Sequence, residues 1–210
     1  MASEPDIVLY YAPQSRSIIA HWMLEELGQP YRLQPLNLKK EDHKQPSYLA
    51  INPMGKVPSI THKGVAISEV AAICCFLADV YPEAGLAVPA GDKRRGPYLK
   101  WLFFGPSCLE PAIVDRMFKR PDAAASSLGY GSFDATLDVV AKAVAAGPYL
   151  LGEKFTAADV VIGSNLIWGA MTQTVPERPA FSAYTGRLQA RPALQRVYAK
   201  DAELVAAQAA

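Results

Sequence analysis

The chain has no apolar run approaching the roughly 18 residues that a helix needs to span a bilayer. Its first segment, from Met1 to Asp6, is polar and acidic, unlike a secretory signal peptide. Because both signals are missing, we expect a cytoplasmic protein with no membrane partner.

An excess of charge of one sign is also missing. The chain carries 21 basic and 20 acidic residues, so its formal net charge at pH 7 is only +1. Proteins that bind nucleic acid through charge show a basic excess, which this composition lacks. The short basic run over 93–95 predicts a solvated helix start. We therefore expect no nucleic-acid partner.

Cysteine and histidine are scarce, with three of each in 210 residues. Cys74 and Cys75 are adjacent and Cys108 is distant, so no spacing resembles a zinc site or a redox pair. The histidines are scattered, and no hydrolytic triad is indicated. These patterns predict reduced core cysteines and no metal cofactor.

The first 80 residues mix the signals of strands and helices. The apolar, β-branched run Ile7–Tyr11 predicts a buried strand, and the alternation over 31–38 predicts a second one. Between them, residues 15–27 repeat apolar side chains at helical spacing, and Gly28 follows as a C′ glycine would. A short helix is expected over 47–51.

The next segment starts with turn residues. The sequence NPMGKVP at 52–58 leads into an extended chain, and strands at 59–61 and 65–67 are predicted to form a hairpin. Ser68 is suited to the N-cap of a helix running from 69 to about 80.

Strand signals stop after that helix. Residues 81–91 contain prolines and glycines typical of a linker, and the remainder is alanine-rich with helical periodicity. An α/β domain over 1–81 and an all-helical domain over 90–210 are therefore predicted. Pro106 and Pro111 are expected to kink or break the first helix of the second domain. The predicted helices lie near 92–118, 125–146, 156–173, 180–190 and 192–207.

Thr156 and Asp159 have the spacing of a capping box, with aspartate in place of glutamate. The helix that follows is apolar almost all round, which predicts the core of the helical domain. We therefore expect this pair to serve folding and not catalysis.

Four segments in order resemble the glutathione transferase family, and together they span nearly the whole chain. They are LYYAPQSRS at 9–17, NPMGKVP at 52–58, ISEVAAI at 67–73 and FTAAD at 155–159. The resemblance implies a thioredoxin-like domain with a mixed four-stranded sheet, followed by an all-helical bundle. It also implies a homodimer that uses glutathione as co-substrate and a small, largely apolar electrophile as its second substrate.

The resemblance also implies where glutathione binds. Val57 would pair its main chain with the cysteinyl unit beside a cis Val57–Pro58 bond. The γ-glutamyl carboxylate would lie at the helix that starts after Ser68, where free amides and the helix dipole favour an anion. Glu69 would accept hydrogen bonds from the ligand's ammonium group, and Val70 stands where many members have serine. The implied glutathione-binding residues are Arg16, Lys56, Val57, Pro58, Ser68 and Glu69.

Catalysis in this family requires the glutathione thiol to ionise near neutral pH. Its ordinary pKa is about 8.5, and a hydroxyl donor at a helix N-terminus would lower it. The positions that often hold the catalytic serine or cysteine carry Gln14 and Arg16 here. We therefore expect Ser15 as the donor, then Ser17, with Tyr11 as a third candidate, while Arg16 adds positive potential.

The electrophile site is expected between the domains, lined by residues at the start of the helical domain. Its candidates are Tyr98, Trp101, Leu102 and Cys108. The predicted reaction is conjugation of the glutathione thiolate to the electrophile. Two alternatives stay open: a glutathione-dependent isomerase, peroxidase or dehalogenase on the same fold, and a non-catalytic binding protein.

Overall fold

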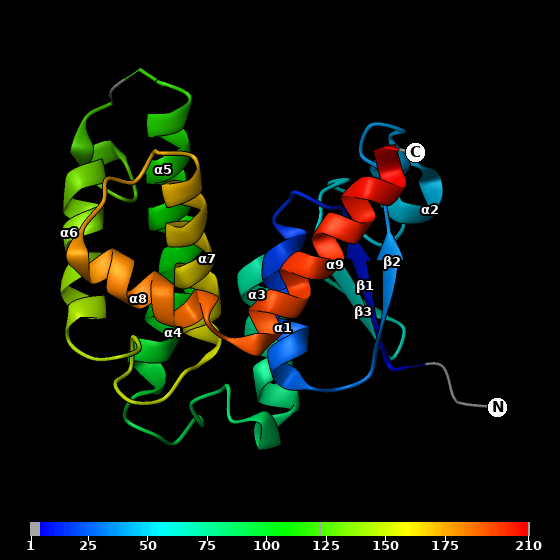
Figure 1. Cartoon of the computed structure of the whole chain (residues 1–210), viewed down its shortest axis with the longest axis horizontal. Helices are drawn as coiled ribbons and strands as arrows, with labels where there is room; N and C mark the ends of the chain where they lie inside the picture. The colour runs from blue at the N-terminus through cyan, green and yellow to red at the C-terminus, as the bar shows by residue number, and fades with distance from the viewer. Residues whose placement is uncertain (1–4, 122, 210) are drawn as a thin grey trace. The chain divides into compact units, whose positions relative to one another are not determined.

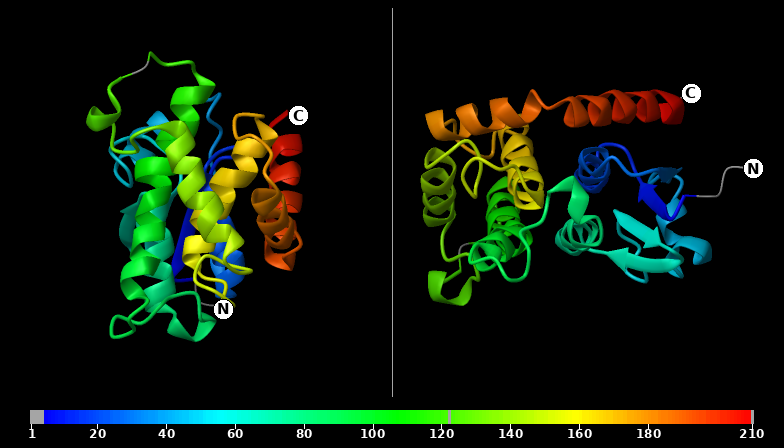
Figure 2. Two further views of the ribbon diagram at one scale, coloured as in Figure 1. Left: turned by 90° about the vertical axis from the view of Figure 1, so that its left-hand side faces the viewer. Right: turned by 90° about the horizontal axis from the view of Figure 1, so that it is seen from below.

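The computed structural model describes residues 5–121 and 123–209. Its contacts divide the chain into two compact units, each visible in Figures 1 and 2. The first contains the residues up to Ala84 together with those from Arg191 onward, and the second is Gly85–Ala190. Within the described ranges, no helix is both long and apolar enough to cross a membrane.

The first unit contains a four-stranded mixed sheet in the order β2-β1-β3-β4. Strand β1 (Ile7–Tyr11) pairs in parallel with β2 (Tyr31–Pro35) and antiparallel with β3 (Ser59–His62), which pairs antiparallel with β4 (Val65–Ser68). Strand β1, one of the two inner strands, is almost wholly buried, as its unbroken apolar run predicts. The predicted mixed four-stranded sheet is confirmed.

Helices α1 (Ser17–Leu27) and α3 (Val70–Val80) pack on each other and against the sheet. The last helix, α9 (Pro192–Ala209), packs on α1, so the end of the chain belongs to the first unit (Figure 1). The short helix α2 (Pro46–Leu49) precedes the 52–58 loop. Gly28 ends α1 in a left-handed conformation, as predicted.

Several predicted boundaries in this unit differ from the structure by one to three residues. The second strand ends at Pro35 and not at 38, because Asn37 turns the chain by accepting hydrogen bonds from the Lys39 and Lys40 amides. The N-cap of α3 is Glu69 and not Ser68, which pairs with Ser59 at the end of β4. The first helix begins at residue 17 and not 15.

Over residues 85–121 and 123–190, the second unit contains helices, loops and turns and no named strand, which confirms the predicted fold class. Its central helix α7 (Ala157–Met171) is buried on nearly every side. A short 3-10 turn, η4 (Ala125–Ser127), precedes α6 (Phe133–Ala145), whereas the sequence predicts one helix over 125–146. The helical elements are α4 (Arg95–Phe104), η3 (Gly105–Leu109), α5 (Glu110–Met117), α6 (Phe133–Ala145), α7 (Ala157–Met171) and α8 (Pro179–Gln189).

At Pro106, where a kink or break is predicted, the α-helix gives way to a π-helical turn. The chain stays helical from α4 into α5 through the π-helical turn η3, since proline lacks the N–H for a normal helical bond and the turn widens instead. Gly105 in this turn packs so closely on α7 that an added Cβ would lie 2.4 Å from Val161 Cγ1. Pro111 follows this turn at the start of α5.

The predicted capping box at the start of α7 is confirmed. The fully buried Asp159 carboxylate accepts hydrogen bonds from the Thr156 amide, the Leu150 amide and the Tyr184 hydroxyl, each at 2.9 Å. Asp159 therefore ties α8 and the loop before α7 to the core helix, which is a structural role.

Candidate functional site

Strand register brings three loops to one end of the sheet in the first unit. Ser59, at the start of β3, lies opposite Tyr10 on β1 and opposite Ser68 on β4. The same end of the sheet therefore brings together the segment after β1, the segment before β3 and the residue after β4. These are the loops that carry Ser15, Val57 and Glu69, so residues distant in sequence are gathered at one site.

The loop over 52–58 is held by two buried side chains. Asn52 donates to the Lys56 carbonyl at 2.8 Å, and the Tyr48 hydroxyl lies 2.5 Å from the same oxygen. The Val57–Pro58 peptide bond is cis, as predicted. Among residues 5–121 and 123–209, neither the Val57 amide nor its carbonyl has a hydrogen-bond partner. This half-buried residue thus presents one donor and one acceptor.

Glu69 is exposed and has a left-handed backbone, with φ 69° and ψ 118°. A residue with a side chain in such a conformation costs about 1–3 kcal/mol, and such strain is often found at binding sites. Directly after it, the first amides of α3 have no carbonyl of their own helix to bind. The first turn of α3 therefore offers donors to an anion, without a side-chain hydroxyl at Val70.

Ser15 and Ser17 lie 2.9 Å apart through their hydroxyl oxygens. Ser17 is fully buried, and its Oγ accepts the Ala12 amide at 3.2 Å. Ser15 is only half-buried: its hydroxyl lies 2.7 Å from the Ala12 carbonyl and accepts the Ser17 amide at 3.1 Å. Ser17 therefore joins the end of β1 to α1, whereas Ser15 keeps part of its surface exposed. Arg16 beside them is exposed.

Tyr11 is fully buried, and its hydroxyl donates to Asp201 on α9. Burial, and secondly this hydrogen bond, raise the pKa of Tyr11 far above its ordinary value. Because the Tyr11 hydroxyl already donates its proton to Asp201 within the core, Tyr11 is not among the thiol donors that we propose. Asp201 also accepts the Gln14 amide at 3.1 Å, which places this carboxylate beside the loop that carries Ser15.

Sequence reasoning missed Asp201, although one signal could have found it. Leu194, Val197 and Leu204 recur at helical spacing, and Asp201 occupies the position in this apolar stripe where another apolar residue is expected. It is only 9% exposed. A carboxylate placed on the buried face of a helix requires partners, which here come from the β1–α1 loop.

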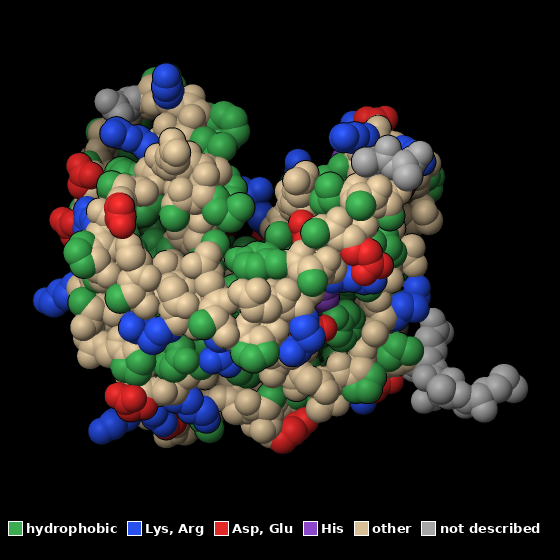
Figure 3. Space-filling model, in the orientation of Figure 1, with side chains coloured by type: hydrophobic (Ala, Val, Ile, Leu, Met, Phe, Trp, Pro, Cys, Tyr) green, Lys and Arg blue, Asp and Glu red, His purple; other side chains and the backbone are tan. Residues whose placement is uncertain are grey.

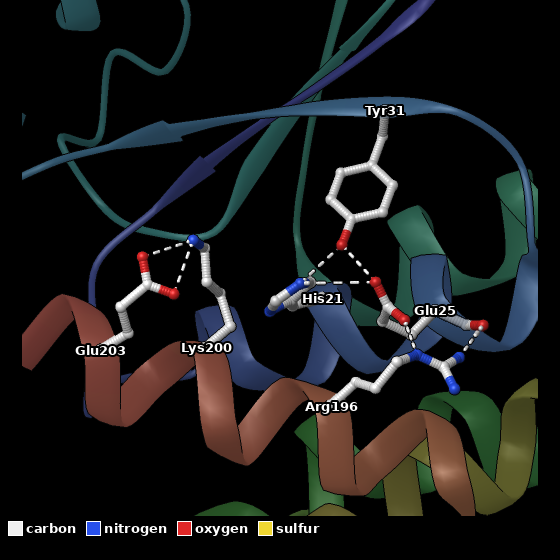
Figure 4. A network of polar contacts seen from close by, with 6 residues as sticks. All are labelled: His21, Glu25, Tyr31, Arg196, Lys200 and Glu203. Atoms are coloured by element: carbon white, nitrogen blue, oxygen red, sulfur yellow. Dashed lines mark hydrogen bonds and ion pairs between the residues drawn. The ribbon is translucent and has the colours of Figure 1, made fainter.

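Polar contacts also join α1, β2 and α9 (Figure 4). The Tyr31 hydroxyl donates to Glu25 at 2.5 Å and lies 2.7 Å from His21 Nε2. Arg196 on α9 donates to Glu25 at 2.5 Å. Burial lowers the pKa of His21 to about 4.

The predicted electrophile residues all lie in the second unit. Tyr98 and Leu102 are fully buried and Trp101 is 5% exposed, whereas Cys108 is half-buried with its sulfur 3.7 Å from the Gly129 carbonyl. The aromatic stripe on α4 therefore forms mainly core.

A cavity of about 610 Å³ opens elsewhere in the second unit. Its lining includes Asp115 and Arg116 of α5 together with Tyr130 and Phe133.

On the face drawn in Figure 3, basic and acidic side chains are interspersed. Within the described residues, no group of three histidine, cysteine, aspartate or glutamate side chains is arranged to hold a metal ion.

Two family models match the sequence: "Glutathione S-transferase, N-terminal domain" over residues 16–80 and "Glutathione S-transferase, C-terminal domain" over residues 111–200. Among curated proteins, glutathione S-transferase 3 of Zea mays is 27% identical, covering 91% of this chain and 92% of the maize protein. Glutathione S-transferase GstA of Escherichia coli O157:H7 is also 27% identical, covering 89% of this chain and 94% of its own length.

Solved structures show the same likeness over both units. The glutathione transferase from Methylococcus capsulatus strain Bath is 31% identical with a TM-score of 0.77, covering 93% of this chain and 98% of that structure. A sphingomonad glutathione S-transferase complexed with glutathione is 28% identical with a TM-score of 0.78, covering 93% of this chain and 98% of its own.

Proposed function

Because the chain belongs to the glutathione S-transferase family, we propose that it conjugates glutathione to small, largely apolar electrophiles. Its first unit has the thioredoxin-like fold and its second the helical bundle that the sequence predicts. The proposed glutathione site is the sheet end where the 12–16, 52–58 and Glu69 segments meet. The observation that carries the proposal is the unpartnered main chain of Val57 at that end, within the described residues.

Each part of the tripeptide has a proposed partner there. The Val57 amide and carbonyl pair with the cysteinyl unit, next to Pro58. The first turn of α3 binds the γ-glutamyl carboxylate through its amides, and Glu69 accepts from the ammonium group beside Ser68. Lys56 and Arg16 supply positive charge to the remaining carboxylate and to the sulfur. The sphingomonad relative was solved with glutathione bound, which supports this ligand.

Ionisation of the thiol is the chemical step that the protein assists. Lowering the pKa of the thiol by about two from its ordinary 8.5 requires roughly 2.7 kcal/mol of differential stabilisation. We assign the donor to Ser15, whose hydroxyl turns from the Ala12 carbonyl to the sulfur, while Ser17 holds the loop. The thiolate then forms a carbon–sulfur bond with the electrophile, and a leaving group departs or the adduct takes up a proton.

The second substrate is proposed to bind at α4 and η3. Trp101 and Cys108 are the proposed contacts, with Tyr98 and Leu102 supporting them from the core. We further propose that the protein acts as a homodimer. Isomerase, peroxidase and dehalogenase reactions use the same thiolate, so a panel of substrates with glutathione, including organic hydroperoxides, would distinguish them.

A non-catalytic binding role is a second candidate. It is favoured by Ser15, whose hydroxyl already serves the backbone at the start of α1, and by the missing hydroxyl at Val70. Glutathione binding without turnover of any substrate in the panel would support it.

Calorimetry with reduced glutathione tests the proposal. We expect binding that weakens strongly for cysteinylglycine, the matched ligand that lacks the γ-glutamyl unit held by α3. If folded protein shows no heat of binding at millimolar glutathione, the proposed function is wrong.

A further inference from the structure

The hydrogen bonds of Asp201 reach the loop before α1 from a residue 187 positions further along the chain. One oxygen of this buried side chain accepts from both the Tyr11 hydroxyl and the Gln14 amide, the latter at 3.1 Å. Tyr11 ends β1, and Gln14 precedes Ser15. The carboxylate therefore joins the end of a strand to the loop that follows it.

Gln14 needs such a partner because its backbone is left-handed, with φ 55°. This conformation is unfavourable for a residue with a side chain and persists only where surrounding contacts fix it. The hydrogen bond from its amide to an ionised acceptor is of the stronger kind. Ser15 follows directly, so the direction in which its hydroxyl points depends on the conformation that Asp201 stabilises.

The position of Asp201 is itself fixed by two ion pairs, one from Arg191 just before α9 and one from Arg196 on α9. Arg191 forms two bonds to the Glu26 carboxylate, at 2.5 and 2.6 Å, and Arg196 bonds Glu25 at 2.5 Å. These arginines precede Asp201 by ten and five residues, and both partners lie on α1. Figure 4 shows Arg196 reaching from α9 to α1. The register of α9 on α1 thus determines where the carboxylate lies.

We propose that Asp201 is a positioning residue for thiol activation, acting through the Gln14 amide on the loop that presents Ser15. The proposal rests on the glutathione transferase function proposed above. The alternative is that Asp201 only anchors α9 to the core through Tyr11. The two roles use different hydrogen bonds, so they can be separated by mutation.

A pair of variants isolates the Gln14 contact. Tyr11→Phe is the reference, because it removes the phenol while Asp201 still accepts the Gln14 amide. The double variant Tyr11→Phe/Asp201→Val also removes that acceptor but continues the apolar stripe of α9, and apolar replacement of a buried charge is usually tolerated. Asp201→Asn is the conservative variant, which retains an oxygen acceptor.

Two measurements follow for each variant: hydrogen exchange of the Gln14 amide without ligand, and the thiolate absorbance of bound glutathione against pH. Relative to Tyr11→Phe, the double variant should exchange this amide at least about tenfold faster. It should also lose about 10- to 100-fold in kcat/KM, with a raised pKa of the bound thiol, since small misplacements near the reacting group are costly. The kcat/KM of Asp201→Asn should stay within about fivefold of the wild-type value.

The outcomes separate this inference from the proposed function. If wild-type protein ionises bound glutathione and the double variant matches Tyr11→Phe in exchange or in thiol pKa, Asp201 is only an anchor and the function stands. If wild-type protein does not bind glutathione, the function and the positioning role fail together. Should the double variant fail to fold, wild-type exchange decides: a Gln14 amide as fast as an exposed one overturns the inference.

Discussion

Ser15 and Ser17 illustrate how two identical side chains two residues apart acquire different roles. Burial commits Ser17 to the Ala12 amide, while Ser15 keeps access to solvent. Removing each hydroxyl in turn therefore tests which of the two a bound sulfur can reach.

Ser15→Ala should raise the pKa of bound glutathione toward its ordinary 8.5 and lower kcat about 100-fold, since one donor to a developing anion is worth that much. Ser17→Ala is the matched control. It should mainly destabilise the fold, by about 1–3 kcal/mol, because the buried Ala12 amide loses its acceptor. Thiol titration and urea unfolding of both variants check this, and a titration unmoved by Ser15→Ala would exclude Ser15.

His21 gives a prediction on pH. Burial lowers its pKa to about 4 in the folded state, below the ordinary 6.5. The unfolded chain thus takes up a proton first as the pH falls, so stability is complete above pH 6.5 and decreases between 6.5 and 4. The expected loss from this group is about 3 kcal/mol.

Urea unfolding of wild type and His21→Gln at the two ends of this range measures the effect. Glutamine can still bond Tyr31 but does not titrate, so the wild-type advantage at neutral pH should shrink by about 3 kcal/mol in acid. An advantage that is the same at both pH values would show that His21 is not held neutral.

At the scale of elements, close packing of η3 on α7 depends on the missing side chain of Gly105. The Cβ of an alanine there would lie 2.4 Å from Val161 Cγ1, so one of the two helical segments would have to shift. Gly105→Ala should therefore destabilise the protein by about 1–3 kcal/mol.

Gly186→Ala is the control for that substitution. Gly186 lies in α8 with nothing within 4 Å of an added Cβ, so alanine there should stabilise by about 0.5–1 kcal/mol through helix propensity alone. Thermal unfolding of both variants gives the comparison, and equal shifts would contradict close packing at η3.

Elements fixed by local signals were predicted well, and those fixed by partners were not. The run Ile7–Tyr11 and the stop at Gly28 are local features, and both predictions hold. The start of α3 depends on Ser68 pairing with Ser59, and this partner is not visible from the neighbouring sequence. The π-helical turn at Pro106 was not predicted as such, because a proline indicates that a helix is distorted but not which form the distortion takes.

The candidate site shows the same division. Its loops were recognised from turn residues and family motifs, and their meeting follows from strand register. The ligand roles of Ser15, Val57 and Glu69 stay predictions. Asp201 escaped notice because its partners lie 187 and 190 residues away.

At the scale of the whole molecule, the proposed homodimer would bury apolar side chains that the single chain leaves in water. Large exposed examples are Met54, Val65 and Phe103, at 73%, 66% and 54% exposure. Light scattering should give twice the chain mass of 22.7 kDa. Burying such a side chain is worth about 1.5–3 kcal/mol, so Val65→Lys should shift the mass toward one chain at low concentration. A wild-type mass of one chain would exclude the dimer.

The membership of α9 in the first unit has a consequence for biosynthesis. A nascent chain leaves the ribosome from its N-terminus, and domains usually fold in that order. Here the sheet is translated before the helical unit, yet the helix that supplies Asp201 to its loop is translated after that unit. The helical unit is therefore complete before the sheet unit, which stays unfinished until α9 has been made.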